Sequence, residues 1–499
     1  MEYLLGVDYG GSAVKATLLD KNGCTCTMAL EEYTTYYPRE SWAEHDPEEL
    51  YRVFCKVSRR ILSTPGLCPE DVVALAISAG SQSAVYLDAH DRVVRNAIYW
   101  ADMRAIHYAL EFKKNQLDYF FRTTANQPTA SRTINHIMWI RDNEPEAYRQ
   151  IRKIMFTKDY IRYRLTGDFV TDYIDAMGSH FMDVPNRNWS KTLCDYAGIT
   201  TEMLPQICSP LDLVSPITPA AAAETGLSPR TKVYVGSTDT VMEVYANGAI
   251  HEGDMIVKVA TAGRIISIAK APIYDVGIVN YEHVVPGLWY PGTGRGYCAS
   301  SYRWFRDVMG QMEMETAKAQ GIDPYVLLDR LAMKAPAGSA GMMFMPYLGG
   351  SNVEPSRRAS FVNVRADHTK AHFVRAVLEG VGYAMKEDFA TINRMKLMAN
   401  NPVLIGGGAK GKIWPQIIAD MLGIEMGLTQ NGDSSLGSAM LAGVASGIFS
   451  SFEDSVHKCV RKSGSILPNP TTAEIYEKGF AVHEKMIEAM DPVYKIMNG

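Results

Sequence analysis

Two aspartates follow short apolar runs and stand in turns of small residues. Asp239 lies in the stretch "YVGSTDT", and Asp8 lies in "GVDYGGS". A lone Asp after a strand is commonly a helix N-cap or a turn residue. The end of a strand in an α/β sheet is also where catalytic groups lie, and an Asp in such a turn can hold Mg²⁺ through water. Both interpretations stay open on these residues alone.

Three turns of small residues point to an anionic ligand. They are Asp8–Ser12, Ala260–Gly263 and Gly406–Ala409, each after an apolar run. Glycines let backbone N–H groups approach a phosphate closely, and Ser12 adds a hydroxyl donor. Taken singly, each turn is also explained by a hairpin or by tight helix–strand packing. Three such turns in two similar halves favour a nucleotide held between two domains.

Bulk properties exclude several classes of protein. The chain has 499 residues, enough for two or three domains, and is 47% hydrophobic and 21% charged. A formal net charge of -5 gives no basic surface for nucleic acid. The eight cysteines are scattered, which fits a reduced cytoplasm. We expect no signal peptide and no membrane-spanning segment.

Strand-like and helix-like segments alternate, which predicts an α/β fold. A strand–turn–strand pattern near residues 254–269 repeats the shape of the opening residues and predicts an internal repeat. We expect helices at 105–121 and 133–165, strands within 71–78 and 84–100, and only helices after residue 451. The predicted domains are 1–250, 251–450 and a C-terminal helical tail, 451–499.

Several longer stretches, in order, resemble the FGGY family of carbohydrate kinases from about residue 3 to about residue 447. They are "GVDYGGSAVKATLLD", "WAEHDPEEL", "AIYWADMRA", "KDYIRYRLTGDFVTDYIDA" and "LIGGGAKGKIWPQIIADMLG". The resemblance implies two actin-like (ribonuclease-H-like) domains, a duplicated fold with a cleft between them. Residues 150–190 are most similar to the xylulose kinases of this family.

The resemblance also implies roles for residues. Asp239 falls on the family's catalytic Asp, which orients the acceptor hydroxyl and accepts its proton as general base. Asp8 falls on the Asp associated with Mg²⁺. The implied ATP-binding residues are Gly10, Gly11, Ser12, Lys15, Thr261, Gly407, Gly408 and Ala409.

The implied substrate-binding residues are Ser81, Gln82, Trp100, Asp102, Asp239 and Thr240. Asp102 and Arg104 alternatively form a structural ion pair. Gln416 and Asp420 also match the adenosine segment, and a solvated helix face explains them equally well.

The chain departs from the family pattern at several of these places. Ser81, Gln82 and Thr240 replace residues that xylulose kinases carry on the sugar side. Other departures are Gly11 for Thr, Ala260 and Ala262 for Gly and Ser, His136 for Lys, and Asn363 for Gly.

The first hypothesis is therefore an ATP- and Mg²⁺-dependent kinase of a ketopentose such as D-xylulose. L-xylulose, ribulose, erythritol, gluconate and glycerol are alternative acceptors. A non-catalytic actin-like ATP-binding protein is the alternative from another class. The resemblance further implies domain closure about a hinge near 247–254, and homodimers are common in the family.

Overall fold

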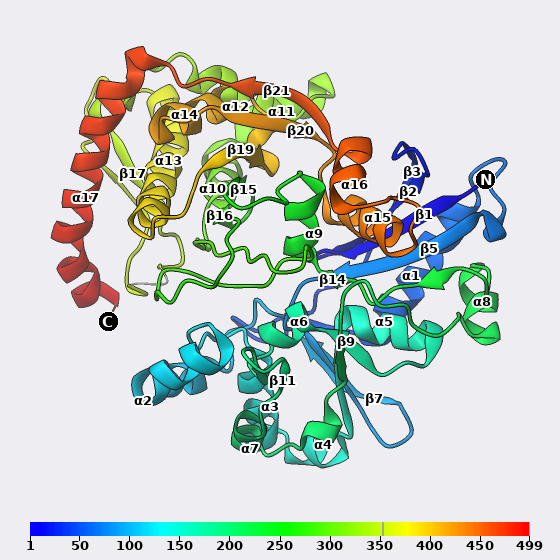
Figure 1. The fold of residues 1–499 in the computed structure, drawn as a ribbon. Coiled ribbons are helices and arrows are strands. Elements are labelled where there is room, and N and C mark those ends of the chain that lie inside the picture. Colours follow the sequence, from blue (N-terminus) through cyan, green and yellow to red (C-terminus); the bar gives the residue numbers. More distant parts are fainter. Residues whose placement is uncertain (352–353, 499) are drawn as a thin grey trace.

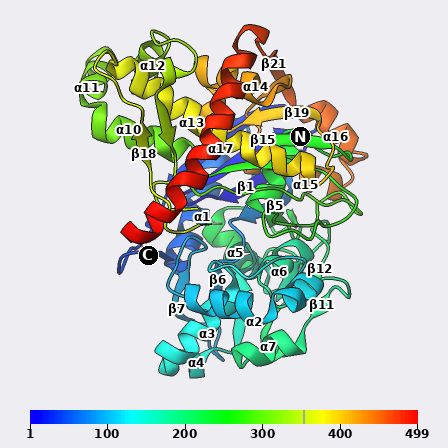
Figure 2. The ribbon, with the colours of Figure 1, turned by 90° about the vertical axis from the view of Figure 1, so that its left-hand side faces the viewer.

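The computed structural model describes residues 1–351 and 354–498 and has two α/β domains, each built around a mixed sheet. The chain runs from the first domain, blue to green in Figure 1, into the second, green to red. Figure 2, turned by 90°, shows the long red helix α17 (Pro470–Asn498) crossing the second domain.

The first sheet has the order β13-β5-β1-β2-β3, with β14 also paired to β5. The strand bounds are β1 Tyr3–Tyr9, β2 Ala13–Asp20, β3 Thr25–Glu32, β5 Val72–Ala79, β13 Lys232–Val233 and β14 Ser237–Thr238. Apolar side chains cover both faces of β1. Leu5 and Val7 pack with Phe54 of α1 (Pro47–Leu62), and Leu4 packs with Leu441 of α15 (Ser434–Ala445).

The second sheet has the order β16-β15-β19-β20-β21. Its strands are β15 Asp254–Val259, β16 Gly263–Ser267, β19 Asn400–Ile405, β20 Met426–Gln430 and β21 Arg461–Ile466. Val257 packs with Val377 of α13 (Lys370–Arg394) and Ile417 of α14 (Ile413–Leu422). The expectation of no strand after residue 451 is wrong. The segment 461–466 has an exposed edge-strand pattern with little apolar periodicity, and it joins the sheet through β20.

The two sheets share one local topology, as the internal repeat predicts. In the first domain β1 pairs antiparallel with β2 and parallel with β5. In the second, β15 pairs antiparallel with β16 and parallel with β19. A short hairpin turn therefore lies at the same point of each sheet.

One helix from the second predicted domain, 251–450, packs on the first. α15 lies between β20 and β21 of the second sheet in the chain, yet it packs on β1, β5 and α9 (Asp239–Ala246) of the first domain. The contact needs small residues, because a Cβ at Gly6 or at Gly437 would overlap backbone atoms of the facing element. The start of α15 is thereby brought to the ends of β1 and β14.

The long helix expected at 133–165 is interrupted. α3 (Thr133–Asn143) ends before Pro145, which begins α4 (Pro145–Gln150), since proline disfavours a helical residue before it. The apolar run Lys153–Phe156 forms β8, which pairs with β6, and α5 (Thr157–Thr166) follows. β8 completes a small sheet, β4-β7-β6-β8, with β4 Glu44–His45, β6 Ala84–Leu87 and β7 Val93–Ile98. The helix expected at 105–121 is α2, Ile106–Thr124.

Shorter elements cover these sheets and their edges. The other helices are α6 Tyr173–Gly178, α7 Lys191–Ala197, α8 Pro219–Thr225, α10 Ala299–Met309, α11 Gln311–Gln320, α12 Pro324–Ala332 and α16 Phe452–Cys459. The other strands form the pairs β9 Val170–Asp172 with β12 Gln206–Cys208, β10 Met182–Asp183 with β11 Asn188–Trp189, and β17 Met343–Met345 with β18 Ser360–Val362. In the part of the chain that the structure describes, no helix combines the length and the apolarity needed to cross a bilayer.

Candidate active site

The carboxylates of Asp239 and Asp8 lie at the carboxyl ends of β14 and β1, the two strands that pair with β5 from either side. Asp239 is the first residue of α9, directly after β14, and Asp8 is near the end of β1. Ser78 Oγ donates to Asp8 Oδ1 over 2.7 Å. Burial and then the negative charge of Asp239 raise the pKa of Asp8 well above its usual range. The two carboxylates therefore act on each other, as two residues of one site do.

Two further carboxylates and two lysines surround this pair. Glu243, one turn along α9, and Asp433, the N-cap of α15, also raise the pKa of Asp8. Glu243 forms an ion pair with Lys258, and Asp433 forms one with Lys15. Lys15 thus lies at the site where the sequence placed it, bonded to a helix from the far end of the chain.

Two tyrosines lie against the predicted first phosphate loop, and one of them, Tyr33, is hydrogen-bonded to it. The hydroxyl of Tyr33 donates to the carbonyl of Gly10, and the backbone N–H of Tyr33 donates to the carbonyl of Ser12 over 3.0 Å. A Cβ at Gly11 would lie 3.0 Å from the Tyr99 hydroxyl. A side chain at this position would therefore make a tight contact with Tyr99, which favours Gly over the Thr of the family pattern.

The predicted second and third loops lie against each other. Thr261 is in the turn between β15 and β16, and its carbonyl accepts hydrogen bonds from the N–H groups of Cys298 and Ser300 at 3.1 and 3.4 Å. A Cβ at Gly408 would overlap the side chain of Val259, whereas one at Gly407 would meet nothing within 4 Å. Gly407 consequently has open space in front of it, as a residue facing a ligand requires. Ala409 ends the same short turn, Gly407–Ala409.

An exposed tryptophan borders Asp239. A Cβ at Gly80 would lie 3.2 Å from the Trp100 ring and 3.9 Å from Asp239 Oδ2. Trp100 is 41% exposed although it is large and apolar. Thr240 donates its hydroxyl to Asp239 Oδ1 over 3.2 Å and its backbone N–H to the same oxygen over 2.5 Å. Trp100 and Thr240 are thus beside Asp239, where the sequence predicts the acceptor.

Ser81 and Gln82, which follow Gly80 in the chain, belong to a second group of polar residues. In the amide orientation that satisfies all partners, Gln82 Oε1 accepts from the Tyr281 hydroxyl at 2.5 Å and from Arg132 Nη1 at 2.8 Å. Tyr281 comes from the segment after β16, so this group joins both halves of the chain. Ser81 Oγ is buried and has no hydrogen-bond partner in the structure. An unpartnered buried hydroxyl is suited to a ligand.

Asp102 does not reach this site as a free carboxylate. Its side chain is fully buried, pairs with Arg104 Nη2 at 2.8 Å and accepts from the N–H of Ala43 at 2.6 Å. The Arg104 guanidinium lies 3.8 Å from the ring centroid of Trp42 and pairs with Glu44 at 2.8 Å. The alternative of a structural ion pair is therefore the one observed, and a substrate contact by Asp102 would first require breaking it.

Gln416 and Asp420 are also held by the protein itself. Gln416 Nε2 donates to Asp420 Oδ1 over 2.7 Å and to the carbonyl of Leu467 over 2.8 Å. Asp420 accepts from the N–H of Asn469 and the hydroxyl of Thr472, both at 2.8 Å. They fasten α14 to the start of α17, so they are not a solvated helix face.

Two other departures are explained locally. Asn363 adopts a left-handed backbone with φ of 60°, which is why the family pattern has Gly there, and its Nδ2 donates to the Gly341 carbonyl at 2.9 Å. His136 is fully buried, and burial lowers the pKa of its ring to about 4. It is a neutral core residue.

Several residues at the site were not found in the sequence. They are Tyr33, Ser78, Tyr99, Arg132, Glu243, Lys258, Arg264, Tyr281 and Asp433. Two signals were available. "GDSSLGS" has the Asp-Ser-Ser composition of a capped helix start, and charged residues on both sides of "VATAG" interrupt an otherwise apolar hairpin.

The donor set fits Mg²⁺ that is shared with a nucleotide. Among residues 1–351 and 354–498, no three His, Cys, Asp or Glu side chains are grouped as a metal cage. Mg²⁺ in kinases usually has one or two carboxylates, with phosphates and water as the other ligands. Asp8, one half-buried carboxylate beside the predicted phosphate loop, matches this pattern.

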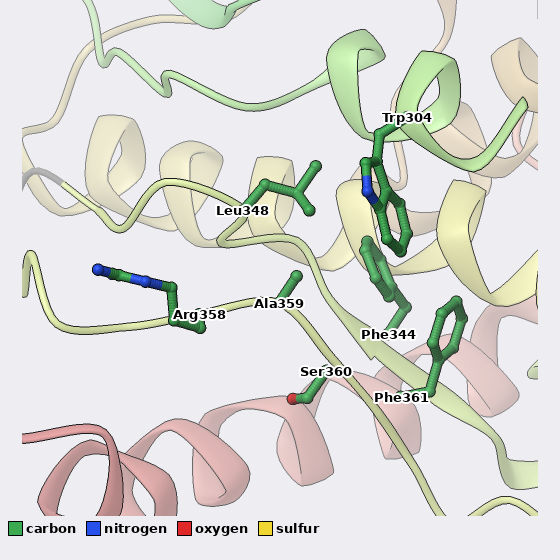
Figure 3. Close-up of a pocket in the computed structure, with 7 residues that line it drawn as sticks. All are labelled: Trp304, Phe344, Leu348, Arg358, Ala359, Ser360 and Phe361. Atoms are coloured by element: carbon green, nitrogen blue, oxygen red, sulfur yellow. The ribbon is translucent and has the colours of Figure 1, made fainter. Parts of the chain in front are cut away.

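An apolar pocket of about 240 Å³ lies elsewhere in the second domain (Figure 3). The rings of Trp304 and Phe344 stack along its side with centroids 6.1 Å apart, while Arg358 points away from them. It shares no residue with the carboxylate site and has no titratable group aimed into it.

Comparison with known proteins identifies the family. Residues 3–245 match the N-terminal domain, and residues 270–446 the C-terminal domain, of the FGGY family of carbohydrate kinases. The chain is 27% identical to a xylulose kinase of Bacillus subtilis over 492 residues (97% of each chain). It is 30% identical to a gluconokinase of the same organism over 464 residues (90% of this chain, 89% of the relative).

A solved structure gives the same result. The crystal structure of a xylulose kinase from Rhodospirillum rubrum superposes with a TM-score of 0.90 over 99% of this chain and all of that one, at 26% identity. The fold expected from the sequence, two actin-like α/β domains, is confirmed. The chain belongs to the FGGY family of carbohydrate kinases, whose members use ATP.

Proposed function

We propose that the protein transfers the γ-phosphate of ATP to a hydroxyl of a ketopentose such as D-xylulose, with Asp239 as general base. The observation that carries this proposal is the place of Asp239. Asp239 directly follows β14, lies beside the exposed ring of Trp100 and acts electrostatically on Asp8 of the predicted first phosphate loop. Similarity to xylulose kinases over nearly the whole chain supports the choice of acceptor.

In this proposal the residues of the chain position ATP and neutralise the charge of its phosphates. The backbone N–H groups of Gly10, Gly11 and Ser12, with Lys15, hold phosphate oxygens, and Thr261 holds them from the other hairpin. Gly407 leaves open space for the adenosine, and Gly408 and Ala409 complete the same turn. Phosphoryl transfer depends mainly on positioning and charge neutralisation, so this cradle supplies most of the rate.

Asp239 has a limited chemical task. A carboxylate is too weak a base to ionise an alcohol before the reaction. It orients the hydroxyl and accepts the proton as the oxygen–phosphorus bond forms. Trp100 and Thr240 border the acceptor on one side, and Ser81 and Gln82 on the other.

Asp8 would hold Mg²⁺, which would supply positive charge to offset the negative charge of the phosphates. Its pKa is raised in the protein alone, because it is buried beside other carboxylates. A divalent cation relieves that repulsion, so we expect metal and nucleotide to bind together.

Gluconate is a second candidate acceptor. Arg132 is 2% exposed and pairs with no carboxylate in the described part of the chain, although buried charges are normally paired. Its guanidinium lies next to Gln82 on the predicted acceptor side. A sugar acid would bring the missing negative charge, and a gluconokinase is among the relatives.

The test is ADP release from ATP and Mg²⁺ with a panel of acceptors. The panel contains D- and L-xylulose, ribulose, erythritol, gluconate and glycerol, and Asp239→Asn is the control. One acceptor that stands out, with the variant silent, supports the proposal. No ADP release with any acceptor favours the non-catalytic alternative.

Three further expectations belong to this proposal. Small-angle scattering tests closure about residues 247–254, since acceptor plus nucleotide should compact the protein. Light scattering tests the homodimer. We place the reaction in the cytoplasm, which the eight unpaired cysteines support.

A further inference from the structure

The two hairpin turns of the phosphate site carry different charges at equivalent places. In the first hairpin, Asp8 of β1 is directly opposite Lys15 of β2. In the second, Lys258 of β15 is directly opposite Arg264 of β16, on either side of the turn that holds Thr261. The internal repeat thus has an acid–base pair in one half and two cations in the other.

Lys258 and Arg264 face the catalytic carboxylates. The face of the sheet that they share also bears Ile256 and Ile266, which pack into the core that contains α9. Lys258 reaches Glu243 of α9 in an ion pair. Although burial opposes its charge, the carboxylates of Glu243 and Asp239 raise the pKa of Lys258.

Arg264 differs from Lys258 because its charge is not matched by an acid. Its Nε donates to the carbonyl of Thr293 over 3.2 Å, and its guanidinium lies 5.9 Å from the ring centroid of Tyr290. Nη2 is buried and has no hydrogen-bond partner. Within residues 1–351 and 354–498, no carboxylate forms an ion pair with it.

Arg264 and Asp239 have two neighbours in common, Lys258 and Tyr290. Both residues act electrostatically on Lys258, and both act on the hydroxyl of Tyr290. Arg264 is fixed by the Thr293 bond and by its strand, so its free N–H is directed by the protein before any ligand arrives. A fixed donor of this kind stabilises charge at little reorganisation cost.

The charge balance of the site requires such a group. Four carboxylates meet there: Asp8, Asp239, Glu243 and Asp433. Lys15 and Lys258 are each paired with one of them, and among the described residues neither Asp8 nor Asp239 has an ion pair of its own. A nucleotide triphosphate adds more negative charge, and Mg²⁺ offsets only part of it. Arg264 is a cation at this place that no acid neutralises.

We propose that Arg264 is a catalytic residue whose Nη2 donates to an oxygen of the γ-phosphoryl group during its transfer. In that step the acceptor oxygen bonds to the γ-phosphorus, and its proton goes to Asp239. The bond from phosphorus to the β,γ-bridging oxygen breaks, and its electron pair leaves with ADP. The arginine stabilises the charge on the equatorial oxygens, as an arginine supplied from within the chain does in other phosphoryl-transfer proteins.

The inference rests on the proposed kinase function, and it explains the altered loops. Gly11, Ala260 and Ala262 stand where the family pattern has Thr, Gly and Ser. Two hydroxyl donors are lost there. A guanidinium at the base of the second turn restores a donor, and it carries a full charge.

The experiment compares the parent with Arg264→Gln, Arg264→Lys and, as a matched control, Arg303→Gln. Arg303 is an exposed arginine on α10. Turnover is measured with the most active acceptor of the panel, and thermal unfolding checks the fold. Calorimetry measures the binding of ADP alone and of ADP with aluminium fluoride plus acceptor, an analogue of the transferring group.

We expect Arg264→Gln to lower kcat by about 10²- to 10³-fold, the usual cost of losing such a donor. KM for ATP and the affinity for ADP should stay within about threefold, because the contact is made during transfer. The affinity for the aluminium fluoride complex should fall by a factor similar to that of kcat. Arg264→Lys and added methylguanidine should each restore part of the rate.

Three outcomes decide the matter. Unchanged kcat and unchanged analogue binding in a folded Arg264→Gln protein overturn the inference and leave the kinase function standing. A loss confined to KM for gluconate, with xylulose turnover unchanged, also overturns it, because Arg264 would then bind a substrate carboxylate. Absence of turnover in the parent with every acceptor overturns the kinase function, and the inference with it.

Discussion

The hydroxyl of Ser434 donates a hydrogen bond of 2.8 Å to the backbone carbonyl of Asp239, 195 positions earlier in the chain. The bond ties the first residue of α15 to the first residue of α9. Asp433, the residue before Ser434, is also the partner of Lys15. A helix from the C-terminal half therefore fixes both the predicted base and the lysine of the first phosphate loop.

Asp239→Asn should abolish phosphorylation without unfolding the protein. The amide keeps the size of the side chain and the Ser434 bond, which goes to the backbone, but it cannot accept the proton. We expect ADP release to fall by about 10³-fold or more, at the upper part of the range for a general base. Calorimetric melting should stay within a few degrees of the parent.

Ser434→Ala is the matched control, since it removes the bond to Asp239 and leaves the carboxylate. One part-buried hydrogen bond contributes about 1 kcal/mol, so the variant should lose a little stability and keep most of its activity. Turnover by Asp239→Asn within a few-fold of the parent would contradict the role as base.

Gly11→Thr, which restores the family residue, should reduce activity in this chain. The new Cβ would approach the Tyr99 hydroxyl at 3.0 Å, closer than ordinary contact, and would push the loop away from the phosphates. Tyr99→Phe removes that oxygen, so the double variant should recover what Gly11→Thr loses. KM for ATP in the four proteins of this cycle is the measurement. Additive effects would show that Tyr99 is not the reason for Gly11.

Local patterns predict the strands and turns of the site well, because they depend on neighbours in the chain. The apolar run before Asp8 and the glycines after it specify β1 and its turn, and the same holds for Thr261. Strand–turn–strand patterns repeat at both places, so the two-domain fold could be predicted. The edge strand β21 could not, since its residues are exposed and only β20 gives it a partner.

Contacts between residues far apart in the chain could not be predicted from the sequence. Lys15 was placed at the site by its motif, but its partner Asp433 is 418 positions away. The sequence leaves Asp102 open between an acceptor contact and an ion pair with Arg104, and only the structure shows the pair formed, with Glu44 and Trp42 against Arg104. Charge pairing of this kind depends on packing between helices and sheets that no local pattern records.

The adjacent glycines of the third turn should respond differently to the same substitution. Gly408→Ala would drive a methyl group into Val259, so we expect a loss of about 1–3 kcal/mol in stability. Gly407→Ala has open space and should melt like the parent, while its methyl group raises KM for ATP. Denaturant unfolding and ATP kinetics on the two proteins check this. Equal stability of both variants would be inconsistent with the packing of the third loop on the second.

The stability of the protein should show a pH dependence that depends on Asp175. This carboxyl is fully buried next to Lys158, at 3.4 Å, and accepts from the N–H of Gln82 at 3.3 Å. Burial, with the charges of Asp172 and Asp159, outweighs the lysine and raises its pKa to about 7.

The sign follows from which state holds the proton. An unfolded Asp ionises near pH 4, so between pH about 4 and about 7 the native state binds a proton that the unfolded state has released. The contribution of Asp175 to the free energy of unfolding therefore falls as pH rises through that window, by at most about 1.4 kcal/mol per pH unit.

Asp175→Asn has no such proton and keeps an acceptor for Gln82. Relative to the parent, the variant should gain stability from pH 5 to pH 8 in urea unfolding, whereas Asp195→Asn, at an exposed position on α7, should not. If the difference in the free energy of unfolding between the parent and Asp175→Asn stays constant across this range, Asp175 is already ionised at pH 5, and Lys158 keeps it so.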